Sequence, residues 1–408
     1  MSGRVFLSGA DIVLPDRIES GQTLVIEDGR IADFVSGPRA IGGGESHVQL
    51  PGAIIVPGFV DVHVHGVEGL DVVDGTDALA GVAARLPKYG VTAFCPTSIA
   101  CAPDVLRTFL GAVSTARISA PAGARVLTAH LESNFISPAY NGAQPASCLR
   151  LPARAIAGTN DDAEFSGAEI LAVIEGSPDV GIVTMAPELE GGFELVERLA
   201  ARGLRVSLGH SGATFEQAQA AIAAGARHAT HLFNRMAPMT HREPGLAGAV
   251  VASEDVAAEI ICDGHHVHQA FVRMAVGAMG RGRVMAITDG TAGSGLAPGT
   301  TAMLGGRRIT VREVARLDDG TTAGSVATMD RVFAWLVSAC AFDVREAAEL
   351  CATTPAREMG LVGHGVISRG SVADLAVLDR NFAVLQTWVG GMPAWPGTSA
   401  PRTPSPLS

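Results

Sequence analysis

The sequence predicts an α/β protein that combines a (β/α)8 TIM-like barrel with a small β-sandwich domain built from both chain ends. Over residues 58–360, short apolar segments typical of buried strands alternate with alanine-rich segments typical of helices, and eight such units in about 300 residues suit a barrel. Both ends of the chain consist instead of short alternating runs broken by turns. We expect these two ends to fold together into one sheet domain.

The composition is typical of a large globular protein and limits the kinds of partner that it can bind. Of the 408 residues, 47% are hydrophobic and 17% are charged, a balance that can bury a sizeable core. The net charge of −11 argues against nucleic acid or an anionic membrane as the main partner. No apolar run reaches the roughly 18 residues of a membrane span. Six scattered cysteines without a CxxC pair are typical of reduced thiols, so we expect a cytoplasmic protein.

The small domain is predicted from two separate segments, residues 1–57 and 361–398. The first contains the runs VFLSGADIV and TLVIEDGRIADFV, in which the EDGR turn is a hairpin signal. The second contains the runs GVISRGSVADLAVLD and VLQTWVGG. The remaining tail, 399–408, is rich in proline and serine and is predicted to be disordered.

The barrel domain, 58–360, is predicted to contain eight strands. The segments LAGVAARLPKYG and FEQAQAAIAAGA are two of the helical stretches that separate them. The strands are expected at 60–65, 92–98, 126–133, 181–188, 205–211, 228–234, 259–266 and 284–290.

The first barrel strand, VDVHVH, is apolar except for three polar side chains. Asp61, His63 and His65 alternate along it and therefore share one face. Two imidazoles at the end of one strand can bind a single metal ion. Asp61 lies deeper, and we expect it to be a structural hydrogen-bond acceptor below the site.

Polar residues also end most of the other predicted strands. In such barrels the active site lies at the carboxyl ends of the strands. One histidine there is commonly structural, but packing alone gives no reason for six strands to end in this way. Imidazole and carboxylate groups together suit Zn²⁺ or another divalent transition ion. The residues are His63, His65, Glu132, His210, His231, His265, His266 and Asp289.

This ordered set resembles the amidohydrolase superfamily. Within it, the stretches LGHSGAT, ATHLFNRM, REPGLAGAV, ICDGHHV and ITDGTA resemble N-acetylglucosamine-6-phosphate deacetylases, and the similarity runs over nearly the whole chain. The resemblance implies a metal-dependent hydrolase that converts N-acetylglucosamine 6-phosphate to glucosamine 6-phosphate and acetate. It also implies a cytoplasmic enzyme and a homodimer.

The resemblance assigns roles to individual positions. Glu132, His210 and His231 match shared metal ligands, and His63 with His65 matches the pair that holds a second metal, so one or two ions, zinc above all, are expected. Asp289 matches the catalytic carboxylate, which takes a proton from metal-activated water and delivers it to the leaving nitrogen. Three further residues match contacts to the sugar phosphate, some of which cross a dimer interface in that family: Asn234, Arg242 and His266.

The lysine content gives an independent constraint. Lys88 is the only lysine of the chain and precedes the second strand. The fourth strand, GIVTMAPE, contains none. A lysine carbamate bridging two metals, or a lysine Schiff base, is therefore excluded at the strand ends. If two metals bind, Glu132 is the expected bridge.

The chain departs from the deacetylase pattern at three places that bear on the substrate. Ser133 and Asn134 follow the glutamate of the third strand, Gln144 replaces a histidine associated with sugar contact, and Arg235 replaces an alanine beside the expected phosphate site. We include Gln144 and Arg235 among the substrate-binding residues. An amidohydrolase acting on a different N-acyl sugar or amine, and a catalytically silent binding scaffold, remain the alternatives.

Overall fold

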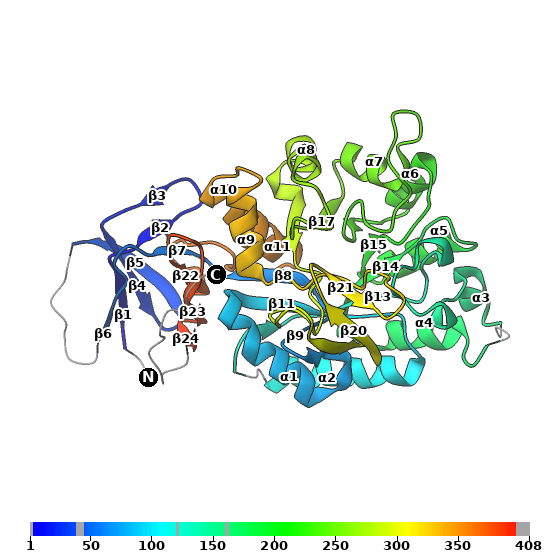
Figure 1. Ribbon diagram of the computed structural model, residues 1–408, viewed down its shortest axis with the longest axis horizontal. Coiled ribbons are helices and arrows are strands. Elements are labelled where there is room, and N and C mark those ends of the chain that lie inside the picture. Colours follow the sequence, from blue (N-terminus) through cyan, green and yellow to red (C-terminus); the bar gives the residue numbers. More distant parts are fainter. Residues whose placement is uncertain (1–2, 38–44, 120–121, 160–162, 397–408) are drawn as a thin grey trace.

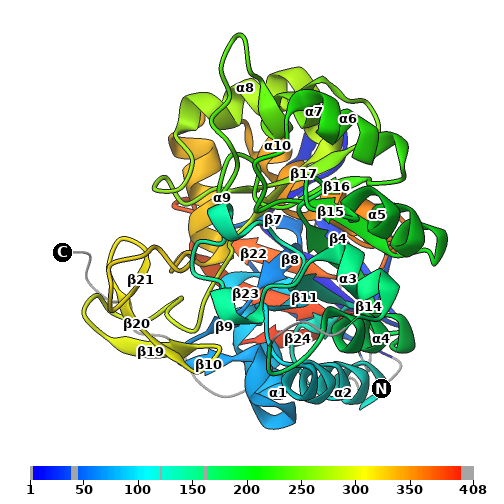
Figure 2. The ribbon, with the colours of Figure 1, turned by 90° about the vertical axis from the view of Figure 1, so that its right-hand side faces the viewer.

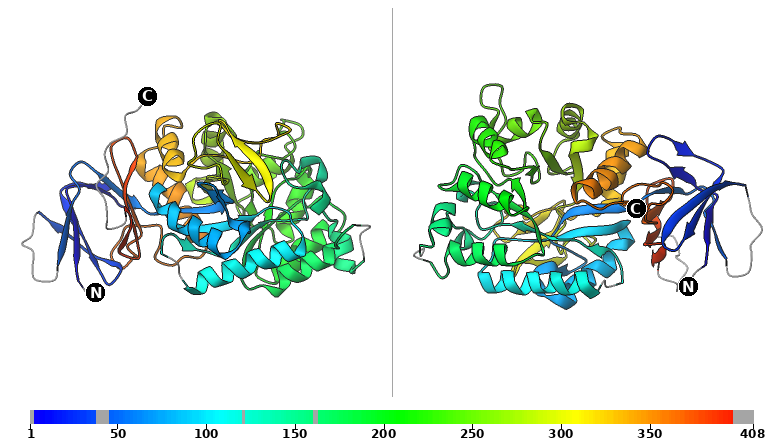
Figure 3. Two further views of the ribbon diagram at one scale, coloured as in Figure 1. Left: turned by 60° about the horizontal axis from the view of Figure 1, so that its bottom comes forward. Right: turned by 180° about the vertical axis from the view of Figure 1, so that it is seen from behind.

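The computed structural model describes residues 3–37, 45–119, 122–159 and 163–396. A small β domain lies at one end of the long axis, and a larger α/β domain forms the rest of the molecule (Figure 1). Segments near both ends of the chain contribute to the small domain, as two further views show (Figure 3). The segment 399–408, predicted to be disordered, lies outside the described residues.

The large domain is built on a parallel sheet whose strands follow the order of the chain. Each strand pairs with the next in parallel, from β11 to β18, while β8 pairs with β11 on the other side. The third unit of the sheet is split into two short strands. The strands are β8 (Phe59–Val64), β11 (Val91–Ser98), β12 (Arg125–Val126), β13 (Ala129–Glu132), β14 (Val180–Met185), β15 (Arg205–Leu208), β16 (His228–Ala229), β17 (Ala257–Ile261) and β18 (Val284–Ile287).

Hydrogen bonds between the first and last strands bring the sheet close to a closed barrel. Val64 and Gly290 form a parallel bridge, and the amide of His65 donates to the Gly290 carbonyl at 2.8 Å. Asp61 is fully buried and accepts from the Thr288 hydroxyl at 2.6 Å. Asp61 therefore joins the two edge strands, in agreement with its expected structural role.

Helices cover the outside of the barrel (Figure 2). Their buried residues recur at helical spacing, as in α5, where Leu195, Val196 and Leu199 face the sheet side. The helices are α1 (Thr76–Arg85), α2 (Pro103–Ser119), α3 (Pro152–Ala157), α4 (Gly167–Gly176), α5 (Gly192–Ala201), α6 (Phe215–Ala223), α7 (Gly245–Ala252), α8 (Gln269–Met279), α9 (Met329–Ser338), α10 (Val344–Ala348) and α11 (Thr354–Glu358).

The small domain consists of two facing sheets with one shared core. In the hairpin between β4 and β5, Asp28 and Gly29 have positive φ of 50° and 76°, as a tight primed turn requires. Core residues from both chain ends, including Leu24, Ile55 and Leu375, pack together. One sheet has the order β5 (Arg30–Ser36), β4 (Gln22–Glu27), β1 (Val5–Ser8), β6 (Ser46–Gln49). The other has the order β24 (Met392–Trp395), β23 (Val384–Val389), β22 (Leu375–Leu378), β7 (Ile54–Pro57), β2 (Asp11–Val13), β3 (Ile18–Glu19).

A three-stranded antiparallel flap, which the sequence did not predict, follows the last barrel strand. It consists of β19 (Thr301–Leu304), β20 (Arg307–Val311) and β21 (Ala315–Leu317). The hairpin of β9 (Gly66–Val67) and β10 (Leu70–Asp71) anchors it, because the Asp71 carboxylate accepts from the Gly305 amide at 2.7 Å.

Most of the predicted barrel strands end earlier than expected. The seventh was predicted at 259–266, but β17 ends at Ile261, so His265 and His266 lie in the following loop and not on a strand. Likewise His210, His231 and Asp289 lie two residues beyond the ends of β15, β16 and β18. Their positive φ angles of 48°, 31° and 50° are incompatible with extended backbone, which explains why each strand stops before them.

Candidate active site

The candidate site lies at the carboxyl ends of the barrel strands, at the bottom of a cavity of about 840 Å³. His65, Glu132, His210, His231 and Asp289 all line this cavity. The flap contributes Leu304, Val314 and Arg316 to its wall. These residues, from five barrel units, and the flap therefore enclose one space.

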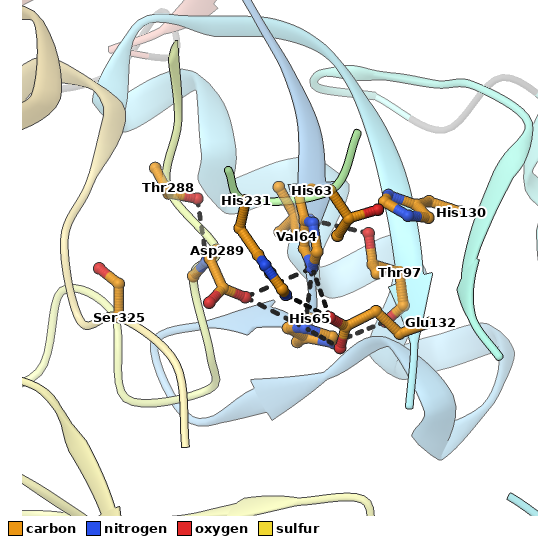
Figure 4. A network of polar contacts seen from close by, with 12 residues as sticks. His63, Val64, His65, Thr97, His130, Glu132, His231, Thr288, Asp289 and Ser325 are labelled. Atoms are coloured by element: carbon orange, nitrogen blue, oxygen red, sulfur yellow. Dashed lines mark hydrogen bonds and ion pairs between the residues drawn. The ribbon is translucent and has the colours of Figure 1, made fainter. Parts of the chain in front are cut away.

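Four imidazole rings direct their Nε2 atoms at each other and at two carboxylates. Figure 4 shows three of these rings, His63, His65 and His231, with Glu132 and Asp289. The Nε2 atoms of His63 and His65 are 3.2 Å apart, and those of His210 and His231 are 3.1 Å apart. Glu132 Oε1 lies 2.9 Å from His210 Nε2 and 2.8 Å from His231 Nε2. The sequence predicts these residues on four different strands, and the fold brings their side chains into contact.

The other ring nitrogens show which tautomers are present. His65 Nδ1 lies 3.0 Å from the Thr97 carbonyl oxygen, and His210 Nδ1 lies 2.7 Å from that of Tyr140. A carbonyl oxygen only accepts, so Nδ1 carries a hydrogen in both rings. His63 Nδ1 donates in the same way to Glu259 at 2.8 Å. Metal binding requires neutral imidazoles, and in that state the Nε2 atoms of these three rings present lone pairs.

This donor set fits divalent metal ions. Three groups of three described residues bring their ligand atoms within 4.8 Å of one another. Two contain the cavity residues: Glu132, His210 and His231, and His63, His65 and Asp289. The third, His63, His130 and Glu259, lies beneath them and has no residue in the cavity wall. Converging lone pairs and carboxylates repel one another unless a cation lies between them. Imidazole and carboxylate ligands at this spacing suit Zn²⁺ and related ions.

Glu132 lies between the two groups. Its Oε1 faces His210 and His231, while Oε2 lies 3.6 Å from His65 Nε2. Burial raises the pKa of Glu132, but its contacts with the imidazoles of His210, His231 and His63 hold it well below its usual range. The amide of Gln144 also donates to Oε2, so this residue contacts a candidate ligand directly.

Asp289 lies on the opposite side of the second group. Its Oδ1 is 3.2 Å from His65 Nε2 and 3.4 Å from His63 Nε2. Burial raises its pKa, but the interactions with His63 and His65 lower it further, so the group is ionised. Its left-handed backbone is a strained conformation for aspartate, of a kind that clusters at functional sites.

Beneath the ligands lies a buried polar layer that includes Glu259 and His228, neither of which the sequence pointed to. Glu259 is fully buried and contacts His63 and also His228, whose Nε2 lies 3.0 Å from Oε1. His130 packs edge-on against His63 with ring centroids 4.6 Å apart and bonds Thr184 at 2.8 Å. Burial lowers the pKa of His130 to about 3, so it is neutral. A glutamate inside the apolar run AAEII was the available signal for this layer.

The expected substrate-binding residues divide into two groups. Gln144, Asn234, Arg235 and His266 line the cavity. His266 Nδ1 bonds Asp263 at 2.7 Å; burial lowers the pKa of His266, but this contact raises it above its ordinary value. Arg242 is exposed and does not line the cavity of its own chain, so the structure does not bring it to the other four.

The first of the three departures in sequence, Ser133 with Asn134, does not line the cavity. Ser133 donates to the Thr184 carbonyl at 2.5 Å, and the Asn134 side chain donates to the carbonyls of Cys101 and Cys148. Both residues are buried and hold the loop after β13 in place. Among the departures, Gln144 and Arg235 are thus the ones that can contact a molecule bound in the cavity.

The fold and this site define a class of enzyme. The sequence matches the amidohydrolase family over residues 54–393, and the chain belongs to that family. Among described helices, none is long and apolar enough to cross a membrane.

Individual relatives of this chain carry names that are more specific than that of the family. The chain is 35% identical over 405 residues to N-acetylglucosamine-6-phosphate deacetylase of Rattus norvegicus, covering 94% of this chain and 95% of the rat protein. It is 30% identical over 371 residues to N-acetylgalactosamine-6-phosphate deacetylase of Escherichia coli O157:H7, covering 90% and 93%. The structure of a mutant N-acetyl-D-glucosamine-6-phosphate deacetylase from Mycobacterium smegmatis, in complex with N-acetyl-D-glucosamine-6-phosphate, is similar with a TM-score of 0.82 at 30% identity, covering 96% and 99%.

Proposed function

We propose that this chain hydrolyses the N-acetyl amide of an amino-sugar phosphate, with N-acetylglucosamine 6-phosphate as substrate and glucosamine 6-phosphate and acetate as products. The observation that carries this proposal is the convergence of four imidazole Nε2 atoms and two carboxylates at the base of a cavity that also bears cations. Relatives covering nearly the whole chain bear this activity in their names. All residues expected for catalysis are present in this chain.

In this proposal His63, His65, Glu132, His210 and His231 would hold the metal, which we take to be zinc. If two ions bound, Glu132 would be the residue shared between them, because its two oxygens face the two groups. A bound divalent cation supplies a water of lowered pKa and polarises the amide carbonyl. Asp289 is the catalytic base and acid. Its ionised carboxylate faces the same centre as the ligands, so it can take a proton from the attacking water and release it to the amine nitrogen.

The phosphate end of the substrate is assigned to Asn234, Arg235 and His266, which line the cavity. His266 donates Nδ1–H to Asp263, which leaves Nε2 for a ligand. Arg235 packs its side chain over Gly142, where an added Cβ would come within 2.7 Å of Nε. A guanidinium can form two parallel hydrogen bonds with a phosphate.

Arg242 is assigned a role in a homodimer. It is exposed and lies outside the cavity of its own chain, so a phosphate contact requires it to reach the site of a partner subunit. We also place the enzyme in the cytoplasm, because its six cysteines are free and five of them are buried.

The first experiment compares acetate release by zinc-loaded protein from three substrates. These are N-acetylglucosamine 6-phosphate, its galactosamine epimer, and unphosphorylated N-acetylglucosamine. Release that depends on the phosphate supports the proposal, and the faster epimer identifies the sugar. Absence of release from all three, with metal shown to be bound, favours the alternative of a different N-acyl amine, since Gln144 and Arg235 differ from the deacetylase pattern.

The phosphate assignment is tested by Arg235→Ala. We expect KM for the phosphorylated substrate to rise about 10- to 100-fold, while kcat/KM for the unphosphorylated sugar changes little, because a charge-assisted hydrogen bond contributes about 1.5–3 kcal/mol. Arg308→Ala is a matched control, since Arg308 is exposed on the flap and pairs with Asp318. Equal effects of Arg235→Ala on both substrates would remove Arg235 from the phosphate site.

A further inference from the structure

A fully buried carboxylate lies beneath the candidate ligands. Glu259, on β17, has no exposed surface. Its Oε2 lies 2.8 Å from His63 Nδ1, and its Oε1 lies 3.0 Å from His228 Nε2. The amide of His231 also points to Oε2 at 3.4 Å. The side chain thus has partners on both oxygens and does not line the cavity.

Burying a carboxylate in a barrel core costs free energy that an apolar residue would not. The neighbouring side chains of the strand, Ala258 and Ile260, are apolar and equally buried. Glu259 therefore calls for a role that packing does not explain. Its contact with His63 suggests one, because His63 Nε2 faces the ligands at the base of the cavity, whereas Glu259 lies behind the ring and does not line the cavity.

The contact determines which nitrogen of His63 faces the site. With Nδ1–H donated to Glu259, Nε2 carries a lone pair directed at His65 and Asp289. A carboxylate behind a ligating imidazole fixes its tautomer and orientation and raises its basicity. The corresponding acceptors behind His65 and His210 are backbone carbonyls. Among the candidate ligands, His63 is thus the one whose orientation depends on an acidic side chain.

We propose that Glu259 is a positioning residue that makes His63 a metal ligand, and thereby controls occupancy of the second cation position, formed by His63, His65 and Asp289. The position formed by Glu132, His210 and His231 depends on it much less. This inference rests on the proposed metal-dependent function but concerns metal binding alone, so the two can fail separately.

The test is a titration of metal-free protein with Co²⁺, which reports both stoichiometry and, by its visible absorption, ligand geometry. In Glu259→Gln and Glu259→Leu we expect the second ion to bind about 10- to 100-fold more weakly, with the first ion affected little. The loss should be smaller for glutamine. His228 Nδ1 has no partner within the described residues, so that ring can change tautomer and accept from the new amide, while His63 still donates to the amide oxygen.

Thr230→Val is the matched control. Thr230 is fully buried in the same layer and bonds only the hydroxyls of Thr184 and Ser207, not a ligand. It should fold with comparable loss of stability and bind both ions as the parent does. A second control uses His63→Asn: in that background, Glu259→Gln should cause no further loss, because the two residues act through one contact.

Three outcomes would overturn the inference. One is tight binding of the second ion by both folded Glu259 variants, and another is equal weakening of both positions, which would make Glu259 a general structural residue. The third is a parent protein that binds a single ion. If the parent binds two ions and the variants lose one, but no amide substrate is turned over, the inference stands and the proposed function fails.

Discussion

Two regions of the molecule contain a buried carboxylate surrounded by basic groups, and they differ in where the hydrogens lie. One is Glu132 in the candidate site. The other is Asp374, 3% exposed, at the junction between the small domain and the barrel. Asp374 accepts from Arg125 at 2.9 Å, from His364 Nδ1 at 2.7 Å and from the Gly390 amide at 2.7 Å. Every partner of Asp374 is a proton donor.

Glu132 faces atoms of the opposite kind. In the neutral state that metal binding requires, the Nε2 atoms of His65 and His210 present lone pairs, because their Nδ1 hydrogens are directed at backbone carbonyls. The Asp374 cluster needs no metal ion, because three donors already hydrogen-bond the carboxylate. The Glu132 cluster becomes favourable when a cation binds. The position of the hydrogens, more than residue type or burial, distinguishes a structural ion cluster from a metal site.

Removal of the metal should give the largest difference between the two clusters, because only the Glu132 cluster is expected to bind an ion. Treatment with a chelator should abolish acetate release and lower the unfolding free energy by about 2.7 kcal/mol relative to protein in metal at a hundredfold excess over Kd. Thermal unfolding with and without added zinc measures this change. Activity that persists in protein shown by elemental analysis to be metal-free would contradict the assignment of the Glu132 cluster as a metal site.

Asp289→Asn should have the next largest effect. The amide keeps the shape of the side chain but cannot take a proton, so kcat should fall about 10²- to 10⁴-fold. The ions bound at Glu132, His210 and His231 should remain, which elemental analysis can verify. Turnover close to that of the parent would exclude Asp289 as the base.

Much of the fold could be predicted because its determinants are local. Eight apolar segments separated by helical periodicity indicated the barrel, and the texture of both termini indicated the small domain. The strand ends could not be placed, since His210, His231 and Asp289 adopt positive φ, which tertiary contacts impose against the intrinsic preference of these residues. The flap of β19 to β21 also escaped prediction, as its short strands follow a glycine-rich turn.

The site was predictable only in its outermost features. Histidines and carboxylates stand out in apolar strands, so the groups facing the cavity could be named. Glu259 and His228 were missed because their partners are distant in sequence: His63 lies 196 residues from Glu259. Arg242 shows the converse limit: a sequence motif matched it to the phosphate contacts, but the structure places it on the surface and outside the cavity of its own chain.

Asp374→Asn should affect stability and leave catalysis intact. The amide leaves Arg125 and His364 with a weaker, partly mismatched acceptor, so the unfolding free energy should fall by about 2–4 kcal/mol. Denaturant unfolding measures the loss, and kcat of the folded fraction should equal that of the parent. A fall in kcat without a change in stability would reverse the roles assigned to the two clusters.

The pH dependence of stability should show the smallest effect. Burial raises the pKa of Asp374, but His364, Arg125 and the Gly390 amide lower it below the unfolded value of about 3.9. The unfolded chain then binds more protons in the acid range, so the contribution of Asp374 is complete above about pH 5 and is lost as the pH falls through the lowered folded value. Asp374→Asn should flatten the fall in unfolding free energy between about pH 5 and pH 3. Because its proton donors are already in place, this cluster should show the same pH profile with and without zinc. A profile that shifted with zinc would mean that the two clusters are coupled through the barrel.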